Sequence, residues 1–144
     1  MNLFGTIKHM NILLVDDDKW IRDSMTVLFE AEGCALKALE TAEEGLEIIK
    51  NQKFDIAIVD YRLPNMDGLE FLERIGVLMP NIMRILITAY GDKKMFSRAK
   101  RIGVEEYIAK PFTSENIEET LTRLVRAQDK EPNDLLNERR CKDV

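Results

Sequence analysis

Four short apolar runs, each ending at a polar residue, limit what this chain can fold into more than any other feature. The runs occupy residues 12–15, 56–59, 85–87 and 107–109, and the polar residues that follow them are Asp16, Asp60, Thr88 and Lys110. Short, continuously apolar runs rich in β-branched residues are typical of strands buried on both faces, as in a parallel sheet covered by helices. Ligands of such sheets bind at the carboxyl ends of the strands, so we expect these polar side chains to converge in one crevice.

Segments with apolar residues at helical spacing separate the runs. Thr41 and Glu44 have the pattern of a capping box, in which each side chain accepts a hydrogen bond from the other residue's backbone N–H. Further caps and stops are expected at Gly33, Asp67, Gly103 and at Thr113 or Ser114. With a short second strand near residues 34–38, five strands alternate strictly with five helices, which predicts an α/β fold.

Composition and charge are those of a soluble, single-domain protein. The chain has 144 residues, of which 45% are hydrophobic and 33% are charged. Its net charge of −5 argues against a nucleic-acid-binding surface, which needs Lys and Arg to neutralise phosphates. No apolar run approaches the roughly 20 residues of a membrane span, and residues 1–10 lack the pattern of a signal peptide. We therefore expect a cytoplasmic protein that binds neither nucleic acid nor membrane directly.

The cysteines, the histidine and the chain ends complete this organisation. Cys34 and Cys141 lie far apart, and we expect both to be free thiols in a reducing cytoplasm. The one histidine, His9, precedes the first strand, which argues against a histidine-based metal site or catalytic triad. We divide the chain into an N-terminal extension at residues 1–10, one domain at 11–127 and a polar tail at 128–144.

The polar residues at the strand ends are the types that a phosphoryl site with a divalent cation needs. The adjacent acids at residues 16–18 repel one another unless a cation such as Mg²⁺ neutralises them; alternatively, they favour the start of a helix. Asp60 is either a cap or turn residue, or a nucleophile that takes a phosphoryl group to form an acyl phosphate. In the second case Lys110 neutralises charge on that group, and the Thr88 hydroxyl donates to one of its oxygens.

Five motifs follow one another along the chain. Asp16-Asp17 comes after the first run, and the stretch DYRLPNMDGLEFL, which begins at Asp60, contains the pattern D-x-x-[ML]-P-x-[ML]-[DN]-G. The other three motifs are Thr88-Ala89, Tyr107 and Lys110-Pro111-Phe112. In this order and at these spacings they resemble the receiver domain of two-component response regulators, over about residues 10–127. Together with the strict alternation, this predicts a flavodoxin-like (βα)5 fold, a doubly wound parallel five-stranded sheet in the order 2-1-3-4-5.

The resemblance also implies the role of individual residues. It makes Asp60 the phosphoacceptor, Thr88 and Tyr107 the switch residues, and Mg²⁺ the cofactor. The implied ligands of Mg²⁺ are Asp17, Asp60, the backbone carbonyl of Arg62 and, through water, Asp16. The resemblance further implies a cis peptide bond between Lys110 and Pro111.

The predicted function is signalling controlled by phosphorylation. A sensor histidine kinase or phosphotransfer protein donates the phosphoryl group to Asp60, and the chain is not an enzyme beyond self-catalysed phosphoryl transfer and autodephosphorylation. One alternative is a Mg²⁺-dependent phosphatase similar to haloacid-dehalogenase hydrolases, but Trp20 stands where their D-x-D-x-[TV] motif needs Thr or Val. Another is an unphosphorylated interaction module, which predicts a broken acidic pair, acceptor or Lys, whereas all are present.

Several residues are not settled by the family pattern. Arg62 and Tyr90, two residues after Asp60 and Thr88, are expected to reach over the phosphoryl group and tune its lifetime. Trp20 either borders the pocket or is an exposed helix residue. Opposite charges on two helices predict partner contact, or a homodimer through the fourth helix, fifth strand and last helix. The residues concerned are Lys93, Lys94, Arg98, Lys100 and Arg101 on one side, and Glu115, Glu118 and Glu119 on the other.

Overall fold

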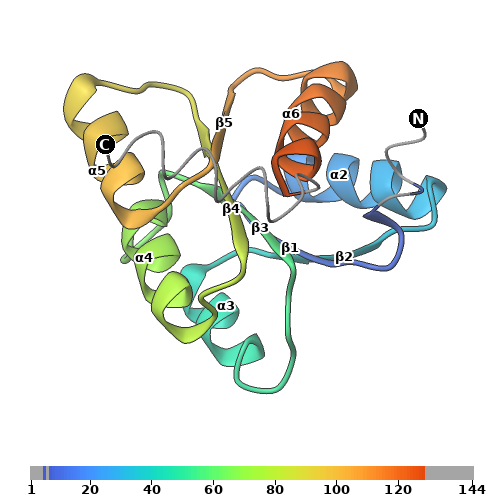
Figure 1. Ribbon diagram of the computed structural model, residues 1–144, viewed down its shortest axis with the longest axis horizontal. Helices are drawn as coiled ribbons and strands as arrows, with labels where there is room; N and C mark the ends of the chain where they lie inside the picture. Colours follow the sequence, from blue (N-terminus) through green and yellow to red (C-terminus); the bar gives the residue numbers. More distant parts are fainter. Residues whose placement is uncertain (1–4, 6, 129–144) are drawn as a thin grey trace, which may run out of the picture.

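In the computed structural model, which describes residue 5 and residues 7–128, five parallel strands form one sheet between two layers of helices (Figure 1). The strands are β1 (Asn11–Val15), β2 (Ala35–Leu39), β3 (Ile56–Asp60), β4 (Met83–Thr88) and β5 (Glu106–Ala109). The helices are α2 (Lys19–Ala31), α3 (Ala42–Ile48), α4 (Gly68–Leu78), α5 (Lys93–Ile102) and α6 (Ser114–Gln128). The strand order is β2-β1-β3-β4-β5, so the predicted flavodoxin-like fold is confirmed.

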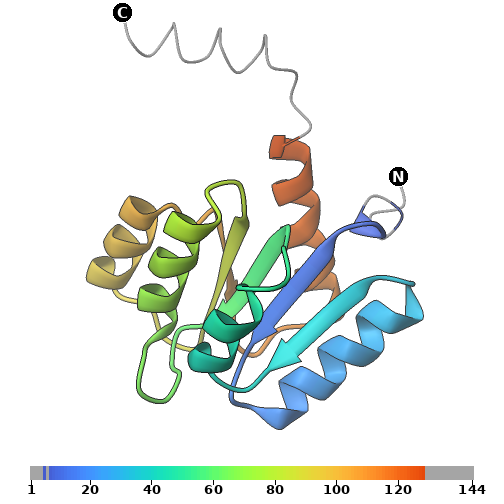
Figure 2. The same ribbon diagram turned by 90° about the horizontal axis from the view of Figure 1, so that it is seen from below.

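Alternate residues of the central strands belong to opposite layers, because successive side chains of a strand point to opposite faces. In β1, Ile12 and Leu14 pack in the core beneath α2 and α6, whereas Leu13 and Val15 pack in the core beneath α3, α4 and α5. Figures 1 and 2 show these two layers on either side of the sheet. All four side chains are fully buried, which is why the run is continuously apolar.

Aromatic side chains fix the helices on each layer. Phe29 of α2 and Phe71 of α4 are both fully buried, one in each core. Burying a side chain of this size stabilises the fold by roughly 1.5–3 kcal/mol relative to leaving it exposed. The apolar residues whose helical spacing predicted these two helices are therefore the ones whose side chains face the sheet.

The helix boundaries follow the expected capping residues. Thr41 and Glu44 form the reciprocal hydrogen bonds of a capping box at the start of α3, and the Asp67 side chain accepts from the Glu70 N–H at the start of α4. At the start of α6, Thr113 rather than Ser114 accepts from a helix N–H, that of Asn116 at 3.1 Å. Gly103 ends α5 in the left-handed conformation, with φ of 96°.

The chain ends differ in part from the predicted boundaries. Ile7, within the predicted extension at residues 1–10, is fully buried in the core beneath α2 and α6. An extension that simply precedes the domain would leave this apolar side chain in water, so the packed unit begins before Asn11. Residues 129–144 of the predicted tail, with Cys141, lie outside the described residues, whereas Cys34 is a buried free thiol. None of the helices in the described part of the chain has the length and hydropathy that crossing a membrane requires.

The register of the sheet places the ends of four strands side by side. Val15 pairs with Val59, so the residues that follow them, Asp16 and Asp60, are neighbours. Asp60 pairs in turn with Ile87 of β4, and Thr88 pairs with Ala109 of β5. Because all the strands are parallel, their polar end residues meet at one edge of the sheet, as the sequence predicts.

Candidate functional site

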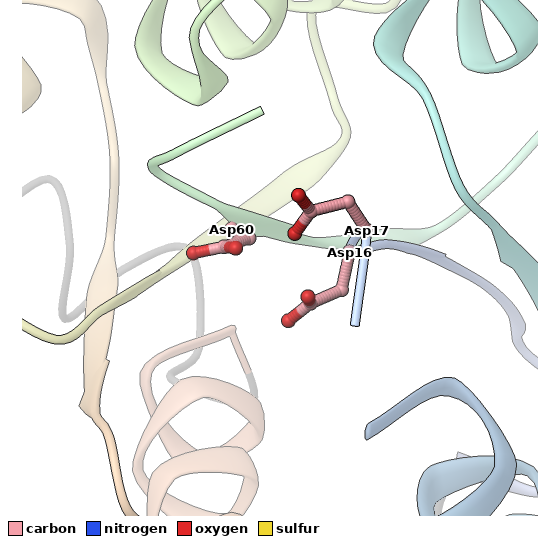
Figure 3. A group of neighbouring side chains, drawn as sticks. All are labelled: Asp16, Asp17 and Asp60. Atoms are coloured by element: carbon pink, nitrogen blue, oxygen red, sulfur yellow. The ribbon is translucent and has the colours of Figure 1, made fainter. Parts of the chain in front are cut away.

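Three carboxylates from two strand ends face one another at this edge (Figure 3). Asp16 and Asp17 follow β1 and Asp60 ends β3, and one oxygen of each lies within 4.8 Å of the other two. Asp16 is fully buried and Asp60 is 4% exposed, whereas Asp17 is open to solvent. A group of three acids with one exposed member can take a cation from solution at that member's side.

The third acid of the run, Asp18, has a different role from Asp16 and Asp17. Its side chain accepts from the Trp20 N–H at 2.9 Å and caps α2. Its own N–H donates to Asp16 Oδ1 at 2.9 Å, which orients the Asp16 carboxylate. The helix-start interpretation therefore applies to Asp18, whereas Asp16 and Asp17 belong with Asp60 to an acidic group with the spacing of metal ligands.

Lys110 approaches the cluster from the end of β5. Its Nζ lies 3.1 Å from Asp60 Oδ2, to which it donates a hydrogen bond, and 3.3 Å from Asp16 Oδ2. The peptide bond between Lys110 and Pro111 is cis, as the resemblance implies. The ammonium thus lies where negative charge on a group attached to Asp60 would develop.

Burial and crowding change the protonation of these groups. Burial, followed by the charge of Asp60, raises the pKa of Asp16 to about 6, although the hydrogen bond from Asp18 opposes this. Burial also raises the pKa of Asp60, against the lowering effect of Lys110 and of the Arg62 backbone N–H. Burial alone would lower the pKa of Lys110, but the two carboxylates outweigh it and the pKa is raised, so Lys110 stays an ammonium.

The residues present fit a small, hard divalent cation. Lys110 pairs with two of the three carboxylates, those of Asp16 and Asp60. Asp16 Oδ2 is nevertheless a buried oxygen that no hydrogen-bond donor satisfies, because Lys110 lies at ion-pair distance from it without hydrogen-bond geometry. Oxygen donors of this kind, with one face open to water, suit a cation that keeps several waters.

The family of the chain follows from comparison with known proteins. The sequence pattern of the family described as "Response regulator receiver domain" matches residues 12–122. The chain is 33% identical over 112 residues to sporulation initiation phosphotransferase F of Bacillus subtilis, covering 78% of this chain and 90% of that protein. A CheY-like receiver domain structure from Methanospirillum hungatei is 35% identical with a TM-score of 0.73, covering 82% of this chain and 98% of that one. The chain belongs to the response regulator receiver family.

The receiver is thus homologous to regulators of two-component systems, and a phosphoacceptor role is consistent with the family. Receiver domains interact with histidine kinases or phosphotransfer proteins. The chain spans only part of other relatives: it is 34% identical to the transcriptional regulator FixJ of Rhizobium meliloti over 54% of that protein. It is 33% identical to DctD of the same organism over 25% of that protein. Membership in this family leaves the phosphatase alternative without support.

Thr88 and Tyr107, which the resemblance implies as switch residues, contact neighbours other than the acidic cluster. The buried Thr88 hydroxyl donates to the Tyr90 carbonyl at 2.7 Å and accepts from the Tyr90 N–H at 3.2 Å. Tyr107 is half-buried, and its ring meets Phe96 of α5 edge to face, with centroids 5.0 Å apart. The sequence signals did not identify Phe96, whose contact with Tyr107 depends on how α5 packs against β5.

The residues expected to tune the receiver are all exposed. Arg62 lies two residues after the end of β3, and Tyr90 lies two residues after the end of β4. Both residues are exposed, and the exposed fraction of Tyr90 is 78%. Trp20 is also 78% exposed, yet it lines a hollow of about 650 Å³ together with Tyr90 and Lys110. Trp20 is therefore an exposed helix residue that borders a hollow beside Lys110, and the residues that line this hollow do not include Asp17 or Asp60.

Metal-free receiver is expected to become more stable as the pH falls from about 7.5 to about 5. The pKa of Asp16 is raised from 3.8 to about 6, so its stabilising contribution is complete below 3.8 and is lost as the pH rises through about 6. The expected gain in the free energy of unfolding over this range is about 1 kcal/mol. Denaturant unfolding in EDTA measures it, and Asp16→Asn should remove most of the pH dependence. If wild type instead loses stability as the pH falls from about 7.5 to about 5, and Asp16→Asn does not, the assignment is contradicted.

Proposed function

We propose that Asp60 accepts a phosphoryl group from a phosphohistidine on a sensor kinase or phosphotransfer protein, and that the acyl phosphate changes the output surface of this receiver. The observation that carries the proposal is the position of Asp60, buried at the end of β3 with Lys110 Nζ 3.1 Å away and Asp16 and Asp17 beside it. Membership in the response regulator receiver family supports a cytoplasmic location.

In the proposed transfer, an Asp60 carboxylate oxygen forms a bond to phosphorus while the bond between phosphorus and the donor's imidazole nitrogen breaks. The imidazole leaves with the electron pair of that bond and takes up a proton. Lys110 supplies positive charge to the phosphoryl oxygens. Bound Mg²⁺ would offset further negative charge, held by Asp17, Asp60, the Arg62 carbonyl and, through water, Asp16. The chain is not a turnover enzyme in this proposal, because it modifies and then dephosphorylates only itself.

The proposed switch begins at Thr88. Its hydroxyl bonds the Tyr90 backbone in the unphosphorylated protein, and a phosphoryl oxygen on Asp60 offers it a charged acceptor instead. Releasing Tyr90 frees the loop between β4 and α5, and that loop leads to Phe96 and its partner Tyr107. The two arrangements of this segment form the two-state element that phosphorylation biases.

Phosphorylation by acetyl phosphate tests the function without a cognate kinase. Wild-type protein incubated with acetyl phosphate and Mg²⁺ should gain the mass of one phosphoryl group, and a matched sample in EDTA should gain much less. Exposure of the modified protein to hydroxylamine should remove the group, as expected for an acyl phosphate. Absence of any gain in mass, or equal gain with EDTA, contradicts the proposal.

Phosphorylation is also expected to promote self-association. The exposed basic residues of α5 and the exposed acids of α6 carry opposite charges on one molecule, and two such surfaces pair across a two-fold axis. Light scattering with and without a phosphoryl mimic should show a dimer only with the mimic, and Lys94→Glu with Arg101→Glu should abolish it. Lys53→Glu, outside both helices, is the control. A monomer in both states contradicts the homodimer and leaves a separate partner for this surface.

Replacing Arg62 and Tyr90 together by Ala is expected to speed dephosphorylation. Hydrolysis needs a water molecule aligned with phosphorus opposite the Asp60 oxygen, and two large side chains at this approach hinder it. The expected acceleration is about tenfold, equivalent to about 1.4 kcal/mol in the barrier. Decay of the phosphorylated protein in excess Mg²⁺ after removal of the donor measures it. Unchanged or slower decay in the double variant would show that these side chains do not shield the group.

A further inference from the structure

The side chain of Arg22 contacts the acidic loop in a way that neither the sequence nor the family pattern indicated. Arg22 lies one turn into α2 and is half-buried, and its Nη1 donates to the backbone carbonyl of Asp16 at 2.9 Å. Lys110, in contrast, binds the carboxylates of the cluster. Arg22 therefore places a cation beside the acidic loop without occupying any oxygen that a metal would use.

The hydrogen bonds of this loop show why the carbonyl matters. The Asp16 N–H donates to Leu39 at the end of β2, the Asp18 N–H donates to Asp16 Oδ1, and Asp18 caps α2. These bonds hold the residues on both sides of Asp17. Within the described residues, the exposed Asp17 carboxylate itself has no hydrogen bond or ion pair. Its direction therefore depends on the peptide group between Asp16 and Asp17, whose oxygen Arg22 holds.

We propose that Arg22 is a positioning residue for the divalent-cation site: by fixing the Asp16 carbonyl, it presents the Asp17 carboxylate to the cation. This inference rests on the proposed function, in which Asp17 is a ligand. A hydrogen bond from a charged donor is stronger than one between neutral groups, which suits a bond that must hold a loop of mutually repelling acids.

The sign of the effect separates positioning from simple electrostatics. A positive charge near a cation site repels the cation, so removing the charge alone should tighten Mg²⁺ binding. Loss of the carbonyl contact lets the Asp17 carboxylate take many directions and should weaken binding. Lys19 offers the matched control, since it lies on the same helix, its side chain is 81% exposed, and among the residues that the structure describes its ion pair is with Asp23.

The experiment is calorimetric titration with Mg²⁺ of wild type, Arg22→Met, Arg22→Lys, Lys19→Met and Asp17→Asn. We expect Arg22→Met to weaken binding about tenfold, Arg22→Lys to restore a good part of it, and Lys19→Met to change it less than about twofold. Asp17→Asn should weaken binding at least as much as Arg22→Met. Unchanged or tighter binding in Arg22→Met, with weakened binding in Asp17→Asn, overturns the role of Arg22 alone. Unchanged binding in Asp17→Asn overturns the proposed metal site as well.

A destabilised variant separates positioning from a general loss of stability. Met25 of α2 is 2% exposed in the core, away from the acidic loop, so Met25→Ala lowers stability without touching the Asp16 carbonyl. We expect Met25→Ala to lower the melting temperature at least as much as Arg22→Met, yet to bind Mg²⁺ as wild type does. Equal loss of affinity in the two variants would overturn the inference. Hydrogen exchange of the Asp18 amide, which donates to Asp16 Oδ1, should quicken in Arg22→Met and not in Lys19→Met.

Discussion

Replacement of Asp60 by Asn is expected to reduce phosphorylation by acetyl phosphate by at least about a hundredfold, because a neutral amide is a far weaker nucleophile than a carboxylate. The change keeps the size and nearly the shape of a side chain that is only 4% exposed, so the packing at the end of β3 survives. It also replaces the charged acceptor of the hydrogen bond that Lys110 donates at 3.1 Å with a neutral amide oxygen. Intact-protein mass spectrometry in the presence of Mg²⁺ measures the yield of phosphorylated protein.

Asp18→Asn is the matched control for this experiment. It makes the same chemical change beside the cluster of Asp16, Asp17 and Asp60, but Asp18 caps α2, and Asn caps a helix as well as Asp does. The control should therefore take up phosphate at close to the wild-type rate. If Asp60→Asn gains the phosphoryl group with wild-type yield, another residue is the acceptor. Loss of phosphorylation in both variants would point instead to the summed charge of the cluster.

Replacement of Gly68 by Ala should destabilise the fold and disturb the acceptor together. Gly68 begins α4 directly behind the end of β3, and its N–H donates to the Tyr61 carbonyl at 2.8 Å. An added Cβ would lie against the Asp60 carbonyl oxygen, 2.8 Å from the Asp60 carbonyl carbon and 3.0 Å from the Tyr61 Cα. These are backbone atoms that cannot swing aside. Overpacking of this kind costs about 1–3 kcal/mol of stability.

Denaturant unfolding measures this loss, and Gly76→Ala in the same helix is its control. There the atoms nearest to an added Cβ belong to the guanidinium of Arg84, which can shift at the end of its long side chain by giving up the hydrogen bond that its Nη1 donates to the Leu72 carbonyl at 3.1 Å. The gain in helix propensity offsets part of that cost. Gly68→Ala should therefore unfold at lower denaturant than Gly76→Ala and should also take up phosphate more slowly. Equal stability of the two variants would show that α4 moves away from β3 at little cost.

Much of the fold was predictable because its signals act over a few residues. A strand buried on both faces must be continuously apolar, and a helix must repeat its apolar residues every three or four positions, whatever the rest of the chain does. The capping box at Thr41 and Glu44 is likewise a matter of two residues three apart. The prediction was weakest for the second strand, which was placed near residues 34–38, one residue before the observed Ala35–Leu39. Its signal is weak because β2 lies at the edge of the sheet and its residues are not fully buried.

The members of the candidate site were predictable for a related reason. Parallel strands bring their carboxyl ends to one edge, so the polar residues after four apolar runs had to meet there, and the register places Asp16 beside Asp60. The family resemblance added what spacing alone left open, the cis bond before Pro111 among them. The separate role of Asp18, as the cap of α2, became clear only from its hydrogen bonds.

The sequence by itself determined the class of fold and the residues that gather at the site, because these depend on periodicity and on the direction of strands. The strand order was implied by the family resemblance. The tertiary structure alone decided which neighbour each side chain binds. The Thr88 hydroxyl bonds Tyr90, Arg22 holds the Asp16 carbonyl, and Phe96 packs on Tyr107. Such contacts depend on side-chain rotamers and on the distance between packed elements, and the spacing of residues along the sequence indicates neither. The burial of Ile7 could not be predicted from the sequence either, because a single apolar residue shows no periodicity that would indicate its place in the core.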